Sequence, residues 1–296
     1  GVVTASGWAL DPDTTGPIIV QLYVDASDYT MVWADLPRPD VAAVYPSHGP
    51  DHGFAISLAV PDGQHRVCLY AVNTGAGAST VLGCAIVGTQ PLPACYYGDV
   101  PTRFQAYDDW YRTLLDTIYL LPSTYAPGDL VDTGAAGLNS GYSVRGLVVN
   151  DLRDMAQAAR AAGAPFVVTS AYRSYATQVS TFNYWVSRIG YSAALLTAAR
   201  PGHSEHQLGT TLDFTSPSGV EPWDYSDWGT SAAGAWLREN AWRYGFVMSY
   251  PPIVSPSVTC YTYEPWHFRY VGRQAAAAVH SSGLTLREYL WTTWGG

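Results

Sequence analysis

The sequence predicts an α+β protein preceded by an all-β, sandwich-like region, and two observations support this. Up to about residue 88, short runs of β-branched and aromatic residues alternate with turn-rich stretches, without a helical pattern, which is typical of an antiparallel sandwich or barrel. After residue 95, apolar residues recur at helical spacing between short apolar runs. Because 296 residues exceed the usual domain length of about 100–200 residues, we expect two domains: residues 1–88 and 95–296, joined by a linker at 89–94.

The first domain is expected to consist of strands. These strands are 18–25, 54–60, 65–73 and 81–87, separated by turns such as 11–17 and 61–63. A hairpin centred on Gly75-Ala76-Gly77 would place Cys68 directly opposite Cys84. Opposed strand residues have Cα separations of about 4.5–5.5 Å, which a disulfide tolerates, so the spacing predicts a Cys68–Cys84 bond.

In the second domain, apolar spacing predicts helices over 104–118 and 144–159, and a strand over 165–170. Ser174 is a suitable N-cap for a helix that runs through Trp185. A further helix is expected from Ser231 to a glycine cap at Gly245, followed by a strand over 246–250. Mixed helices and short strands make this domain α+β.

Composition favours an extracytoplasmic protein. Charged residues make up 13% of the chain, against an average of about 25%, while aromatic residues reach 14%. The first residues lack the pattern of a signal peptide, so we expect that such a peptide has been removed. The four cysteines form no CxxC pair, and their even number fits two disulfides in an oxidising compartment. For Cys260, we expect a bond to Cys95; the alternative is a nucleophilic or ligating role beside Glu264.

Charge and hydropathy argue against two classes of partner. The formal net charge is −9 and no basic run occurs, which argues against binding nucleic acid or anionic lipid. No apolar run approaches the roughly 20 residues of a membrane span. We therefore expect no membrane insertion. We also expect the protein to be a monomer.

Two segments, 204–213 and 264–267, contain the donors of one hydrolytic metal site. A catalytic Zn²⁺ takes three nitrogen or oxygen ligands, which His206, Asp213 and His267 can supply. Glu264 is then free to act as general base. The structural alternative is a polar core network in which Asp213 orients His206 and Glu264 pairs with Arg269. Burying these groups without a metal or solvent would be costly.

Three ordered motifs between residues 95 and 292 resemble the VanY-type D-alanyl-D-alanine carboxypeptidases, zinc enzymes grouped with lysostaphin-type and hedgehog-type folds. These motifs are Ser170-Ala171-Tyr172-Arg173-Ser174 with Gln178, the SxHxxGxxxD pattern of Ser204, His206, Gly209 and Asp213, and the ExWH pattern of Glu264, Trp266 and His267. The family more often has Ala where this chain has Thr211. That change should alter packing beside Asp213 and leave the metal ligands intact.

The resemblance implies one catalytic zinc ion held by His206, Asp213 and His267, with Glu264 as the base. It also implies that Arg173 binds the substrate's carbonyl oxygen or its terminal carboxylate. The expected contacts to the peptide come from Gln178, Ser204, Tyr172 and Trp266. For Gln178 and Ser204, the alternatives are helix-surface polarity and N-capping.

The implied substrate is a peptidoglycan stem peptide that ends in D-alanine, cut by a protein secreted to the cell wall. Endopeptidase cleavage within the stem or cross-bridge is an alternative. A second alternative is a zinc-containing cell-wall binding protein without turnover, against which the presence of both Glu264 and Arg173 argues.

The first domain resembles a small β module of secreted actinobacterial proteins. The resemblance rests on residues 7–13 and on His52-Gly53-Phe54. A spacer role and a cell-wall or glycan-binding role are both open. The side chains that could stack on sugars are Tyr23, Tyr29, Trp33 and Tyr45.

Overall fold

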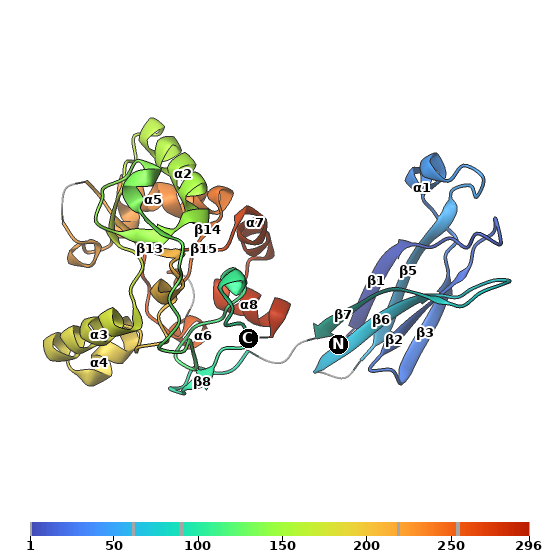
Figure 1. Cartoon of the computed structure of the whole chain (residues 1–296), viewed down its shortest axis with the longest axis horizontal. Helices are drawn as coiled ribbons and strands as arrows, with labels where there is room; N and C mark the ends of the chain where they lie inside the picture. The colour runs from blue at the N-terminus through green and yellow to red at the C-terminus, as the bar shows by residue number, and fades with distance from the viewer. Residues whose placement is uncertain (1, 61–62, 89–91, 218–219, 253–254, 296) are drawn as a thin grey trace. The chain divides into compact units, whose positions relative to one another are not determined.

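The computed structural model describes residues 2–60, 63–88, 92–217, 220–252 and 255–295. The chain divides into two compact units, Gly1–Leu92 and Pro93–Gly296. Figure 1 shows the strands of the first unit and the mixed elements of the second. Part of the expected turn at 61–63 and half of the expected linker, residues 89–91, lie outside the described residues. Among the helices that can be described, none combines the length and apolarity needed to cross a membrane.

The first unit is built from two antiparallel sheets. One has the order β1 (Val2–Trp8), β5 (Asp51–Ala59) and β4 (Leu36–Pro37). The other has the order β3 (Asp28–Trp33), β2 (Ile19–Val24), β6 (Gln64–Ala71) and β7 (Thr80–Gly88), and a short helix, α1 (Pro39–Val44), precedes β5. Alternate residues of β2 are buried together with Phe54 and Ile56 of β5. The two sheets therefore share one core, as the predicted sandwich requires.

The Cys68–Cys84 disulfide is confirmed. The two cysteines face each other in the β6–β7 ladder, with a Cα–Cα distance of 4.1 Å. The sequence prediction missed β1, β3 and the two-residue β4, and the short helix α1 departs from the all-β expectation. The turn before β3 contains Asp25 and Ala26 at positive φ, 50° and 60°. Such a turn usually carries glycine or asparagine, so the sequence has no strong hairpin signal here.

The second unit is centred on a four-stranded antiparallel sheet. Its order is β12 (Val167–Ser170), β13 (Thr211–Thr215), β15 (His267–Tyr270) and β14 (Phe246–Met248). The helices described in this unit are α2 (Val149–Ala161), α3 (Tyr175–Ile189), α4 (Tyr191–Thr197), α5 (Ala232–Asn240), α6 (Pro256–Thr259), α7 (Arg273–Ser282) and α8 (Leu286–Trp294). The smaller strands are β8 (Val100–Pro101) beside β9 (Tyr119–Leu120), and β10 (Leu130–Asp132) beside β11 (Ser143–Arg145).

One face of this sheet forms the main core. Phe214 of β13 and Phe268 of β15 are buried with residues of α2 and α5, among them Leu152 and Leu237. Figure 1 shows α2 and α5 on this side of the sheet and the α3–α4 pair on the other side. Because side chains alternate along a strand, the residues between these core positions point away from α2 and α5.

The starts of α3 and α5 agree with the sequence, but α5 ends at Asn240, before the expected Gly245, and a 3₁₀ turn, Ala241–Tyr244, follows it. Ser174 caps α3 by accepting a hydrogen bond from the Thr177 amide, and Ser231 caps α5 in the same way. The prediction of a helix over 104–118 is wrong: only a 3₁₀ turn, Tyr107–Asp109, forms there. Asp116 accepts hydrogen bonds from the amides of Ile118 and Tyr119, which stabilises a turn in place of a helix.

The helix expected from residue 144 begins only at Val149. Residues 143–145 instead pair with 130–132 as a strand. The Arg145 amide donates to the carbonyl of Gly209, so this segment is also bound to the loop that carries the second motif.

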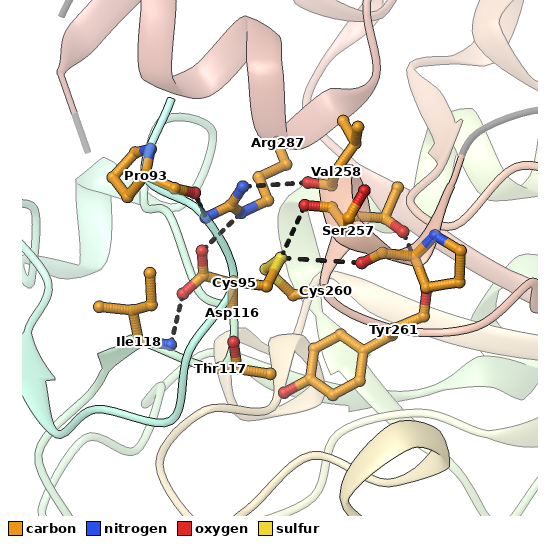
Figure 2. The surroundings of a disulfide bond; sticks show 12 residues. Pro93, Cys95, Asp116, Thr117, Ile118, Ser257, Val258, Cys260, Tyr261 and Arg287 are labelled. Carbon is orange, nitrogen blue, oxygen red and sulfur yellow. Dashed lines mark hydrogen bonds and ion pairs between the residues drawn. A yellow bond between two sulfur atoms is a disulfide. The ribbon is translucent and has the colours of Figure 1, made fainter. Parts of the chain in front are cut away.

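The Cys95–Cys260 disulfide is also confirmed, with a Cα–Cα distance of 5.3 Å across 165 residues of chain. Cys260 is therefore neither a nucleophile nor a metal ligand. Figure 2 shows the bond beside the buried ion pair of Arg287 and Asp116, whose Nε–Oδ2 distance is 2.6 Å. Arg287 also donates to the carbonyls of Val258 and Pro93. The disulfide and this arginine together connect the start of the unit to the segment that leads to Glu264.

Candidate metal centre

Two of the expected ligands lie opposite each other in the sheet. Asp213 of β13 is paired with His267 of β15. Their neighbours Leu212, Phe214 and Phe268 point into the main core, so Asp213 and His267 point to the opposite face. The His267 Nδ1–Asp213 Oδ1 distance is 3.1 Å.

The third expected ligand, His206, lies on the 3₁₀ turn η4 (Glu205–Leu208) that precedes β13. Ser204 caps this turn, and Gly209 ends it with φ of 73°. A side chain at Gly209 would be strained by this φ, and its Cβ would lie 3.0 Å from Cγ of Arg145. The backbone conformation therefore explains why the motif has glycine at this position. His206 Nε2 lies 3.2 Å from Asp213 Oδ2.

Hydrogen bonds at the far side of each ring indicate which nitrogens face the cluster. His206 Nδ1 lies 2.7 Å from the carbonyl oxygen of Ala171, which can only accept, so Nδ1 carries the proton. His267 Nε2 lies 2.9 Å from Glu205 Oε2. These contacts leave His206 Nε2 and His267 Nδ1 directed toward Asp213, as metal ligation by neutral imidazole requires.

The spacing of these donors fits a zinc ion. One ligand atom from each of His206, Asp213 and His267 lies within 4.8 Å of the others, and all three residues are buried. Tetrahedral ligands at about 2.0–2.1 Å from zinc lie about 3.4 Å apart. The shortest contacts of the two histidines with Asp213 are similar, 3.2 Å from His206 Nε2 to Oδ2 and 3.1 Å from His267 Nδ1 to Oδ1, although they reach different oxygens of the carboxylate. Two imidazoles and one carboxylate are also a donor set that zinc commonly takes.

The charges around the cluster favour a cation. Burial opposes ionisation of Asp213, but His206 and His267 outweigh it and hold the pKa of Asp213 well below its usual range. Burial, together with the nearby charge of Arg173, lowers the pKa of His206 to about 4. For His267, burial is outweighed by hydrogen bonds to Asp213 and Glu205, which raise its pKa to about 10. The carboxylates of Asp213 and Glu205 thus favour the protonated, positively charged form of His267. A metal cation bound in the cluster can take the place of the proton on His267.

Glu264 lies beside the cluster and is not one of its three donors. Its Oε2 is 3.7 Å from His267 Nδ1, and its carboxylate makes no hydrogen bond within the described part of the chain. Burial, reinforced by the charge of Asp213, raises the pKa of Glu264 to about 8, although His267 acts against this. A carboxylate in this setting can take up and release a proton near neutral pH. The alternative pairing of Glu264 with Arg269 does not occur: Arg269 Nη1 donates to Glu205 instead.

Arg173 follows β12 and is held in a fixed orientation. Its Nε donates to Gln178 Oε1 at 2.9 Å, and its Nη1 donates to Ser170 Oγ at 2.6 Å. The amide nitrogen of Gln178 donates in turn to the carbonyl of Ala199. Nη1 of Arg173 is 3.8 Å from Asp213 Oδ2, so the guanidinium lies at the edge of the ligand cluster.

A cavity of about 640 Å³ brings these groups together. Of the four residues expected to contact a peptide, three line it: Gln178, Ser204 and Trp266. Gln178 and Ser204 nevertheless accept hydrogen bonds from protein groups, Arg173 Nε and the backbone amide of His206 respectively. Tyr172 is not among the lining residues. An aromatic wall, which includes Tyr184, Trp185, Trp223 and Trp266, bounds the cavity.

Glu205 also lines the cavity, and the sequence reasoning overlooked it. It directly precedes His206, and its carboxylate contacts both His267 and Arg269. Its burial could not be read from the sequence, because a glutamate in the first turn of a short helix is usually solvated. The available signal was a second acidic residue, besides Asp213, in the motif segment 204–213.

Sequence comparisons show similarity over most of the second unit. The profile of a family described as VanY, D-alanyl-D-alanine carboxypeptidase, matches residues 142–273. The D-alanyl-D-alanine carboxypeptidase of Enterococcus faecalis is 33% identical over 197 residues, which cover 62% of this chain and 67% of that protein. The chain spans 65% and 67% of the length of two of the curated relatives it matches, and 36% of the length of a third.

Solved structures agree with this similarity. The LdcB LD-carboxypeptidase is 36% identical with a TM-score of 0.54, and the match covers 61% of this chain and 85% of that chain. A mutant of the vancomycin resistance D,D-pentapeptidase VanY, in complex with Zn(II), is 32% identical with a TM-score of 0.53. That match covers 61% of this chain and 99% of the other.

Proposed function

Because this chain belongs to the VanY family of D-alanyl-D-alanine carboxypeptidases, we propose that it hydrolyses peptidoglycan stem peptides and releases their C-terminal D-alanine. The observation that carries this proposal is the convergence of His206 Nε2, an Asp213 oxygen and His267 Nδ1, with Glu264 beside them and outside the donor set. We propose zinc as the metal, since the donors and their spacing fit it. A zinc ion held there supplies Lewis acidity and lowers the pKa of a water molecule.

In this proposal Glu264 moves the proton. Its carboxylate has no hydrogen-bond donor from the described part of the protein, so it is free to accept a proton from the attacking water. The same carboxyl group then donates that proton to the amine of the departing D-alanine. Burial raises the pKa of Glu264, which favours uptake of the proton and its presence on the carboxyl group for the second step.

Arg173 is proposed to bind the oxygen on which negative charge develops, or the terminal carboxylate of the peptide. Gln178 and Ser170 orient its guanidinium, so we assign Gln178 to positioning Arg173. This leaves a planar group of donors with a fixed charge at the edge of the cavity. Ser204 and Trp266, which line the same cavity, are proposed to contact the peptide.

We expect Arg173→Lys to lower kcat by about 10²- to 10³-fold, the usual effect of losing one donor to a developing oxyanion. Lysine keeps the charge but cannot donate to Gln178 and Ser170 while presenting a planar fork to substrate. The measurement is steady-state release of D-alanine from a defined pentapeptide at matched zinc content. Arg188→Lys, at an exposed arginine of α3, serves as control and should leave kcat unchanged. Equal rates for the two variants would remove Arg173 from the mechanism.

The scissile bond has a second candidate, because LdcB, which is 36% identical over the matched region, is an LD-carboxypeptidase. Mass spectrometry of products from muropeptides of defined stem separates the two. Shortening of a pentapeptide by one D-alanine supports D,D-carboxypeptidase activity. Shortening of a tetrapeptide alone supports L,D-carboxypeptidase activity. Cleavage within the stem or at a cross-link would support endopeptidase activity, and intact substrates would contradict hydrolysis.

For the first unit we propose a role as a cell-wall binding module, with a spacer as the other reading. Tyr29 and Trp33 of β3 are 53% and 57% exposed, and exposed aromatic rings commonly stack on sugars. The test is co-sedimentation of the full chain with insoluble peptidoglycan. A Tyr29→Ala, Trp33→Ala variant that sediments as well as the original protein would favour the spacer.

Two disulfides further support action outside the cytoplasm.

A further inference from the structure

The unassigned residue next to the metal cluster is Glu205. Its side chain is 5% exposed and accepts three hydrogen bonds from three different residues. Oε2 accepts from His267 Nε2 at 2.9 Å and from Ser249 Oγ at 2.7 Å. Oε1 accepts from Arg269 Nη1 at 2.9 Å. Glu205 thus contacts His267 at Nε2, the ring nitrogen that does not face Asp213.

Arg269 fixes this carboxylate in place. It follows His267 by two residues on β15 and points to the same face of the sheet. Its side chain is fully buried, and its Nη2 donates to the carbonyls of Trp110 and Thr113 at 2.8 and 2.7 Å. Glu205 is therefore held between the sheet and the segment around residues 110–113.

We propose that Glu205, supported by Arg269 and Ser249, is the positioning residue of the metal ligand His267. A carboxylate at Nε2 holds the proton on that nitrogen and keeps the lone pair of Nδ1 directed toward Asp213 and His206. The arrangement also couples two ligands, because Glu205 and His206 are consecutive residues of one short turn. This inference rests on the proposed zinc site and adds to it a residue that determines how tightly the metal is bound.

A purely structural ion pair between Glu205 and Arg269 is the competing explanation. The two explanations differ in what they predict for metal affinity. A structural pair would affect folding stability and leave zinc binding by the folded protein unchanged. A positioning residue changes the affinity itself, typically by about 10- to 100-fold when it is lost.

The test measures the dissociation constant of Zn²⁺ by competition with a fluorescent chelator, without any peptide substrate. Glu205→Gln should raise this constant by about 10- to 100-fold, because an amide cannot accept from Arg269, His267 and Ser249 together. The visible spectrum of the Co²⁺-loaded variant should also change, since the orientation of one ligand has changed. Glu239→Gln, an exposed glutamate on α5, is the control and should leave both readouts unaltered.

A second variant covers the case in which Glu205→Gln folds poorly. Glu205→Leu combined with Arg269→Met removes both charges, which often preserves folding where loss of one charge does not. This variant still lacks an acceptor for His267, so its zinc affinity should fall as well. Unchanged zinc affinity in the folded variants would overturn the proposal.

The same experiments separate this inference from the proposed hydrolysis. If the original protein binds zinc and cuts no muropeptide, the proposed function fails while the role of Glu205 remains testable. If the protein cuts muropeptides and Glu205→Gln binds zinc normally, only the positioning role fails. Excess zinc should restore much of the turnover of Glu205→Gln, as expected when lost affinity is the main defect.

Discussion

Glu264→Gln is expected to lower kcat for D-alanine release by about 10²- to 10⁴-fold, the usual contribution of a general acid–base group. Glutamine has nearly the same shape as glutamate and cannot accept the proton of water. Glu264 is outside the set of three donors, so the variant should bind zinc as the original protein does. The measurements are single-turnover hydrolysis of a defined pentapeptide and zinc content by elemental analysis.

The contrast with Glu205 makes this prediction specific. The two glutamates approach His267 at different ring nitrogens, Glu264 near Nδ1 and Glu205 at Nε2. Added zinc should not restore Glu264→Gln, whereas it should largely restore Glu205→Gln. Turnover by Glu264→Gln within about threefold of the original rate would exclude Glu264 as the base.

Arg287→Met is expected to destabilise the second unit by about 3–5 kcal/mol, because it leaves the carboxylate of Asp116 buried without its partner. Both side chains are almost completely buried. Arg287 also donates to the carbonyls of Pro93 and Val258, as Figure 2 shows, so the start of the unit and the segment before Cys260 lose a shared contact. The change in the free energy of unfolding is measured by urea denaturation at a fixed zinc concentration, monitored through the transition of the second unit.

Two further variants test the cause of this loss. Arg188→Met, on the exposed face of α3, should change the free energy of unfolding by no more than about 0.5 kcal/mol. Asp116→Asn combined with Arg287→Met should cost less than the sum of the two single changes, because neither charge is then left unpaired. Strict additivity of the two changes would mean that the ion pair has no energetic role of its own.

Residues that carry chemistry were largely predictable from the sequence. The spacing of His206 and Asp213, with Glu264 and His267 about fifty residues later, already indicated a set of metal donors and a spare carboxylate. The structure brings the three expected donors into one buried cluster. The hairpin prediction placed Cys68 opposite Cys84, as observed, although the register shifts between Leu69 and Tyr70, nearer the turn.

Secondary structure was less predictable where side chains compete with the backbone. Residues 104–118 have helical apolar spacing, yet the carboxylate of Asp116 accepts from two backbone amides and a turn forms. Residues 143–145 belong to a strand because they pair with 130–132 and bind Gly209. Apolar periodicity reports which residues are buried, and long-range hydrogen bonds select the conformation in which they are buried.

The sequence by itself determined the donor types and the all-β and α+β regions, and it predicted both disulfide pairings, of which the structure decided Cys95–Cys260 against a free Cys260. Only the tertiary structure decided how these residues face one another. Because Asp213 and His267 are paired in adjacent strands, their side chains lie next to each other on the same face of the sheet. The contact of Glu205 with His267 joins residues that are 62 positions apart in the sequence. The location of Tyr172 outside the cavity lining, despite its place in a motif, was decided in the same way. Sequence spacing sets local geometry, whereas contacts between distant segments depend on how the whole core packs.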